Sequence, residues 1–153
     1  MQKNIITSFI GPRIYSEFRK LALLNNKDIT SLGIKDIFSS YLHVIESKSK
    51  LSSKDEGVVR QILTYGDNTD ETMVLENIIF ISPRVGTISP WSSRATDIIQ
   101  HCGVGIERIE RIKAISFRTK NDISLTENEK KVLGNLLYDR MTESLFLNQD
   151  NIN

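Results

Sequence analysis

Apolar residues recur in adjacent pairs, four positions apart, in two segments of this chain. The members are Val58, Val59, Ile62 and Leu63 in the first segment and Val132, Leu133, Leu136 and Leu137 in the second. Such spacing forms the buried stripe of an amphipathic helix. Before each segment a hydroxyl residue is followed three positions later by an acid, Ser52 by Asp55 and Thr126 by Glu129, which is a helix-start signal. The pattern therefore predicts two capped helices.

Shorter apolar runs predict five strands. They lie at about 4–9, 34–46, 78–83, 108–120 and 142–147, and each is bounded by polar or turn-forming residues. Just before and within the fourth run, the isoleucines at 106, 109, 112 and 115 recur every third position and do not alternate. A bulged or strongly twisted strand would accommodate that spacing.

Two more helices are expected, each following a strand. One covers about 13–25, with Ile14, Phe18 and Leu21 facing inward. The other starts at Pro90 and ends at Gly103, a residue suited to closing a helix. Its expected apolar face carries Trp91, Ala95, Ile98 and Cys102.

These elements form an internal repeat with an offset of about 74 residues. Repeat one covers about 4–66 and repeat two about 77–147, with a turn-rich connector at 66–72 and a polar tail at 148–153. Each half reads strand, helix, long strand, helix, and neither buries much apolar surface alone. We expect one α+β domain over 1–153, in which the two units pair into one antiparallel sheet covered by helices on one face.

The segment from Pro83 to Asp97 holds the strongest candidate site. Gly86 permits a tight turn, and Ser89 followed by Pro90 is a helix start. Open backbone amides and the positive end of a helix dipole suit an anion, although a capped helix beside solvated arginines is the simpler interpretation. The candidate partner-docking or anion-binding residues are Arg84, Gly86, Thr87, Ser89, Trp91, Ser92, Ser93 and Arg94.

The run PRVGTISPWSSRATDI, at 83–98, resembles the most recognisable stretch in the N-terminal domain of the phosphoribosylformylglycinamidine synthase family. Further motifs follow the family's order across nearly the whole chain. They are Ser16 with Phe18-Arg19, Tyr41-x-His43, Tyr65-Gly66, His101-Cys102-Gly103, Arg108-Ile109-Glu110-Arg111 and Asp139-Arg140-Met141-Thr142-Glu143. The resemblance implies a domain similar to a dimer of the small accessory subunit that multi-chain versions of this enzyme use.

The resemblance also implies a role in purine biosynthesis. The family converts formylglycinamide ribonucleotide, glutamine and ATP into formylglycinamidine ribonucleotide, glutamate, ADP and phosphate. Its ATP and magnesium site and its glutaminase cysteine lie in later domains, so we expect this chain to bind no cofactor and to be inactive alone. The implied partners are the synthetase and glutaminase domains, which the N-terminal module helps to couple, including the protected passage of ammonia.

Composition agrees with an ordinary soluble domain. Hydrophobic residues make up 39% and charged residues 25%, and no apolar run reaches the roughly 18 residues of a membrane helix. We expect a cytoplasmic protein, since the amino terminus lacks a signal-peptide layout and a single cysteine excludes an intrachain disulfide. The net charge is +1, with the basic surplus in 84–120. That surplus is small for a protein that binds nucleic acid through its phosphates.

Few residues suggest catalysis or metal binding. His101 and Cys102 are neighbours on a predicted helix and point about 100° apart, so we expect Cys102 in the core and not as a nucleophile. The two histidines and one cysteine lack zinc-site spacing, and His43 is expected to be structural or to line a pocket. Glu107 and Glu110, flanked by arginines, are expected to form cross-strand salt bridges.

Two other functional classes stay open. The chain would be an independent module for a small anion or nucleotide if Ser89 and the arginines bind one. An α+β sheet of this size can also bind single-stranded RNA, but the aromatic residues here are few and do not cluster at alternate strand positions.

Overall fold

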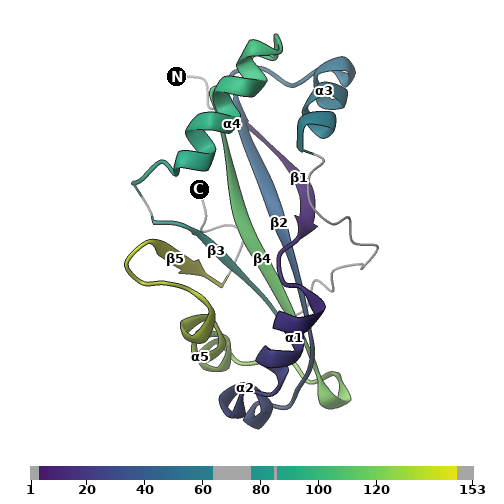
Figure 1. Ribbon diagram of the computed structural model, residues 1–153, viewed down its shortest axis with the longest axis vertical. Coiled ribbons are helices and arrows are strands. Elements are labelled where there is room, and N and C mark those ends of the chain that lie inside the picture. The colour runs from purple at the N-terminus through teal and green to yellow at the C-terminus, as the bar shows by residue number, and fades with distance from the viewer. Residues whose placement is uncertain (1–3, 64–76, 85, 148–153) are drawn as a thin grey trace.

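The computed structural model describes residues 4–63, 77–84 and 86–147, which form a five-stranded antiparallel sheet flanked by helices (Figure 1). The predicted connector at 66–72 and tail at 148–153 lie outside the described residues. The strands are β1 (Ile5–Arg13), β2 (Ile34–Ser47), β3 (Ile78–Pro83), β4 (Arg108–Thr119) and β5 (Glu143–Phe146), in the order β1-β2-β4-β3-β5. The helices are α1 (Glu17–Leu24), α2 (Lys27–Ser31), α3 (Ser53–Leu63), α4 (Pro90–His101) and α5 (Glu127–Leu137).

The two predicted halves meet at the centre of the sheet. The long strands β2 and β4 pair antiparallel, with Asp36 opposite Arg118 at one end and Glu46 opposite Arg108 at the other. β1 pairs with β2 on one side of this centre, and β3 pairs with β4 on the other. The predicted α+β class and the repeated order of strand, helix, long strand, helix are therefore confirmed, with the short helix α2 as an unpredicted addition.

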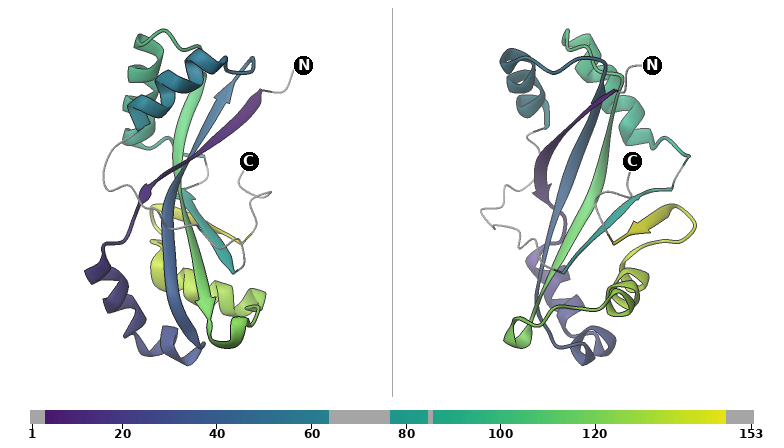
Figure 2. Two further views of the ribbon diagram at one scale, coloured as in Figure 1. Left: turned by 90° about the vertical axis from the view of Figure 1, so that its right-hand side faces the viewer. Right: turned by 180° about the vertical axis from the view of Figure 1, so that it is seen from behind.

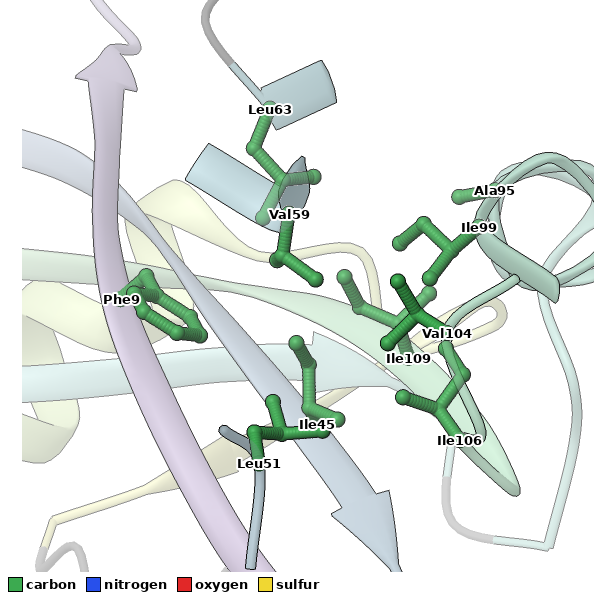
Figure 3. Packing of buried hydrophobic residues seen from close by; sticks show 10 residues of the cluster. All are labelled: Phe9, Ile45, Leu51, Val59, Leu63, Ala95, Ile99, Val104, Ile106 and Ile109. Carbon is green, nitrogen blue, oxygen red and sulfur yellow. The ribbon is translucent and has the colours of Figure 1, made fainter. Parts of the chain in front are cut away.

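Helical residues pack on one face of the sheet, in two clusters at its two ends. The first cluster joins Ile45 of β2 and Ile109 of β4 to α3 and α4 (Figure 3). The second joins Ile37 of β2 and Ile115 of β4 to α1, α2 and α5. Ile37 and Ile45 are separated by an even number of positions along a strand, so both side chains project from the same face. The centre of this face, between the clusters, is where polar side chains gather.

β4 is buried on both faces, which explains its unusual isoleucine spacing. Ile109 and Ile115 face the helices, whereas Ile112 packs with Phe80 and Ala114 in a third cluster on the opposite face, to which no described helix contributes. Of the two expected explanations, a bulge in β4 is not observed, because the β2–β4 register shifts only between Ile34 and Asp36 of β2. The twist is present, as the side views of the sheet show (Figure 2).

The first predicted helix has different bounds and a different buried face. β1 continues to Arg13, and Ser16 caps α1 by accepting a hydrogen bond from the Arg19 N–H. Phe18 and Leu21, expected inward, are 84% and 59% exposed. No α1 residue is fully buried, because only its last turn, through Leu23 and Leu24, reaches the second cluster.

The helix starts at Ser52 and Thr126 are confirmed. Ser52 Oγ accepts the Asp55 N–H at 3.1 Å, and Thr126 and Glu129 form a complete capping box. In α3 the paired stripe is buried or half-buried as predicted. In α5 only one side of the stripe is covered, since Leu133 is buried while Val132 and Leu136 are 46% and 41% exposed.

Candidate functional site

The loop between β3 and α4 is held as a defined turn. Thr87 donates both its N–H and its hydroxyl to the Arg84 carbonyl, at 3.0 and 2.5 Å. Gly86 has φ +86°, a left-handed conformation that favours glycine. The Arg84 N–H donates to the Thr142 carbonyl at 2.9 Å, which ties this loop to the turn before β5. The tight turn and the serine cap predicted here are confirmed, since Ser89 accepts the Ser92 N–H at 3.0 Å.

A carboxylate of the chain itself already occupies the start of α4. Ser89 donates its hydroxyl to Glu110 at 2.9 Å, and its N–H reaches the same carboxylate at 3.5 Å. Arg108 forms an ion pair with Glu110 Oε2 at 3.0 Å and also donates to the Thr87 carbonyl. The positive end of the helix dipole therefore faces Glu110. An external anion would have to displace an intramolecular acceptor to bind there.

Arg111 lies in the middle of the helix-bearing face and stacks on two aromatic rings. Its guanidinium carbon is 4.7 Å from the centre of the Tyr41 ring and 5.0 Å from the centre of the Trp91 ring. Such cation–π contacts fix the plane of an arginine and leave its edge N–H groups available as donors. No ion pair within 4 Å joins Arg111 to a carboxylate of the described residues. Arg111 is therefore a half-buried cation whose position is set by two aromatic rings.

His43 packs against the Trp91 ring of this stack. It lies opposite Arg111 in the β2–β4 register, is fully buried, and stacks on Trp91 with ring centres 5.5 Å apart. Burial, together with the nearby Arg111 charge, lowers the pKa of His43 to about 4. The ring is therefore neutral near pH 7, as a structural histidine under a cation should be.

The stacked side chains of Tyr41, Trp91 and Arg111 line a cavity of about 820 Å³, which we call the central groove. Tyr41, Arg111 and Lys113 from β2 and β4 contribute to it, together with residues of the β3–α4 loop and of the turn at Met141–Glu143. Lys113 is paired with Glu143 at 3.0 Å. Ile88 and Met141, at 62% and 77% exposed, add apolar surface to the lining. A groove of this size, partly apolar and with one positioned cation, suits a protein segment or a small ligand.

The predicted site residues divide into two groups. Arg84, Thr87, Ser89 and Trp91 line the central groove. Gly86 shapes the loop without lining the groove, and the other three lie on α4 away from it. Ser92 is buried and donates to the Ile109 carbonyl, while Ser93 and Arg94 are exposed.

The apolar face of α4 is rotated from the predicted one. Its buried residues are Ser92, Ala95 and Ile99, whereas Ile98 is 47% exposed. The expectation that Cys102 is a core residue is wrong, because Cys102 is the exposed C-cap of the helix. A buried serine was not expected on this face, but its hydroxyl finds a carbonyl on β4, so the polar group is satisfied. His101 binds the Asp97 carbonyl through Nδ1 and not the thiol.

The glutamates expected to form cross-strand bridges have other partners. Glu110 pairs with Arg108 on its own strand, and Glu107 approaches Lys48 in the loop after β2 at 3.7 Å.

The sequence did not identify Tyr41, Arg111 and Lys113 as residues of the central groove. The available signal was the Tyr41-x-His43 and Arg108–Arg111 motifs, which antiparallel pairing brings side by side.

The described part of the chain has neither a cluster of metal-binding side chains nor a helix that could span a membrane. No group of three or more His, Cys, Asp or Glu residues there is placed to hold a metal ion. None of the described helices is long and apolar enough to cross a bilayer.

Comparison with known families gives a match over most of the chain. Residues 40–153 match the family model described as formylglycinamide ribonucleotide amidotransferase N-terminal. The matched region begins in β2 and contains the whole second half, including the β3–α4 loop, Arg111 and the turn before β5.

Proposed function

Since the chain belongs to the formylglycinamide ribonucleotide amidotransferase N-terminal family, which places it in purine biosynthesis, we propose that it is a non-catalytic coupling module of that enzyme. In this role it docks on the synthetase and glutaminase domains and supports the transfer of ammonia between them. ATP and magnesium belong to the other domains, and this chain is inactive alone.

The observation that carries the proposal is the central groove with Arg111 in it. Arg111 is held by Tyr41 and Trp91, and its charge meets no described carboxylate within 4 Å. Tryptophan, tyrosine and arginine are the residue types that dominate binding energy at protein interfaces. A carboxylate from a neighbouring domain would complete the Arg111 site, and an apolar side chain would cover Ile88 and Met141. The groove is thus suited to an acidic segment with an apolar anchor.

The test combines this chain with the rest of the enzyme, produced as a separate polypeptide. We expect association and recovery of glutamine-dependent turnover. Arg111→Ala should weaken association about tenfold or more, because removing an interface arginine leaves its partner carboxylate unsatisfied. Turnover with ammonia in place of glutamine should fall less than turnover with glutamine, since the coupling is lost and not the synthetase chemistry.

Arg118→Ala is the matched control. Arg118 is an exposed arginine of the same strand that lies outside the central groove. Its removal should leave association unchanged. Full glutamine-dependent activity of the remainder without this chain, or equal effects of the two substitutions, would contradict the proposal.

A further inference from the structure

A second cavity, of about 480 Å³, lies between α5, the turn before β5 and the end of the β3 loop. We call it the α5 pocket. Three cationic side chains line it, each from a different segment: Arg84 after β3, Lys131 on α5, and Arg140 before β5. Asn135, Tyr138 and Leu145 complete a wall of mixed polar and apolar character. Its volume falls within the range of small-molecule sites.

The acidic residues near these cations are already engaged. Glu143, the only carboxylate among the described lining residues, pairs with Lys113 at 3.0 Å and accepts the Asp139 N–H at 2.9 Å. Asp139 in turn accepts the Met141 N–H at 2.9 Å. Among the described carboxylates none lies within 4 Å of Arg84, Lys131 or Arg140. The α5 pocket therefore has an excess of positive charge that the described residues do not neutralise.

We propose that the α5 pocket binds the phosphate group of a small phosphate monoester. Three cations match a phosphate dianion better than a single carboxylate, and arginine presents forked donors to phosphate oxygens. The pocket is larger than a phosphate ion alone needs, and Asn135 and Tyr138 offer polar and aromatic contacts to the remainder of an ester. This site differs from the expected anion site at Ser89, which Glu110 occupies.

The pocket and the central groove share only Arg84 and Glu143 among their described lining residues. Lys131 and Arg140 line the α5 pocket alone, so substituting them tests anion binding without touching the proposed docking residues. Both side chains are exposed, and their replacement should leave the fold intact. Circular dichroism of each variant checks this point.

The experiment is a calorimetric titration of the whole chain with glycerol 3-phosphate, inorganic phosphate and, as the uncharged match, glycerol. We expect saturable binding of glycerol 3-phosphate and none of glycerol. Arg140→Ala and Lys131→Ala should each weaken binding about tenfold, the value of one charge-assisted contact. Arg118→Ala, which removes an exposed arginine elsewhere, should have no effect.

Comparing glycerol 3-phosphate with inorganic phosphate distinguishes a phosphorylated metabolite from free phosphate as the natural ligand. Tighter binding of the ester would assign the pocket to a phosphorylated metabolite, whereas equal binding would assign it to free phosphate. Absence of saturable binding by either anion at millimolar concentration would overturn the proposal. An equal loss in Arg118→Ala would overturn it too, because binding would then follow overall charge and not this pocket.

Discussion

His43 is the residue on which the central groove depends most. Its ring lies between the sheet and Trp91, and the neighbouring strand leaves space for it only because residue 11 is glycine. A Cβ at Gly11 would lie 2.4 Å from His43 Cε1. The ring in turn supports the aromatic stack that holds Arg111. The lack of a side chain at Gly11 in β1 thus helps to set the position of Arg111, two strands away.

Protonation of His43 should destabilise the fold. The pKa of His43 is about 4 in the folded chain and near 6.5 when unfolded, so the unfolded state binds the proton more tightly. The stabilising contribution of neutral His43 is fully present above pH 6.5 and is lost as the pH falls toward 4. This loss lowers the free energy of unfolding by about 3 kcal/mol. Urea denaturation of the wild type and of His43→Met between pH 7 and 4 measures this.

The variant should show a shallower loss of stability over that pH range. His101→Gln, which removes the exposed histidine, should keep the wild-type profile. Identical profiles for the wild type and His43→Met would show that His43 does not carry this pH dependence.

At the level of elements, the start of α4 links the loop, the helix and β4. Ser89 caps the helix through the Ser92 N–H and simultaneously donates to Glu110. The Ser89 cap is therefore part of the packing between α4 and the sheet. Trp91, two residues after the cap, stacks on Arg111 from the first turn of this helix.

Ser89→Ala should lower the free energy of unfolding by about 1–2 kcal/mol, because it removes the cap and leaves Glu110 without one of its donors. Ser93→Ala is the matched control one turn later on the same helix, where the side chain is exposed. That substitution should be neutral or slightly stabilising, since alanine has the higher helix propensity. Thermal and urea unfolding distinguish the two, and equal destabilisation would contradict the capping role.

For the whole molecule, the central pairing of β2 with β4 makes the two halves interdependent. Each half contributes one of these strands, and each helical cluster contains residues of both halves. Neither half has its own closed core. The central groove likewise takes Tyr41 from the first half and Arg111 from the second.

Fragments 1–70 and 71–153 should therefore be largely unfolded when separate and should fold when mixed. Each alone would expose the apolar face of a long strand and a helix stripe. Circular dichroism and size-exclusion chromatography of each fragment and of the mixture provide the measurement. A cooperative unfolding transition in either isolated fragment would show that the repeat is an independent folding unit.

The sequence predicted those features of secondary structure that depend on residues close together in the chain. Caps at Ser52, Ser89 and Thr126, the turn at Gly86 and the repeated order of elements depend on short-range hydrogen bonds and on hydrophobic periodicity, and the sequence predicted them. The α+β class and the single antiparallel sheet followed from the repeat.

Only the tertiary structure decided which way the elements face. Phe18 and Cys102 occupy apolar-looking positions yet are exposed, because packing partners and not periodicity choose the buried side of a helix. Alternation along β4 places Ile112 on the face opposite Ile109 and Ile115, but only the structure shows that Phe80 and Ala114 cover it there. The meeting of Tyr41, Trp91 and Arg111 depends on strand register across residues far apart in the chain, and register is a property of the folded sheet.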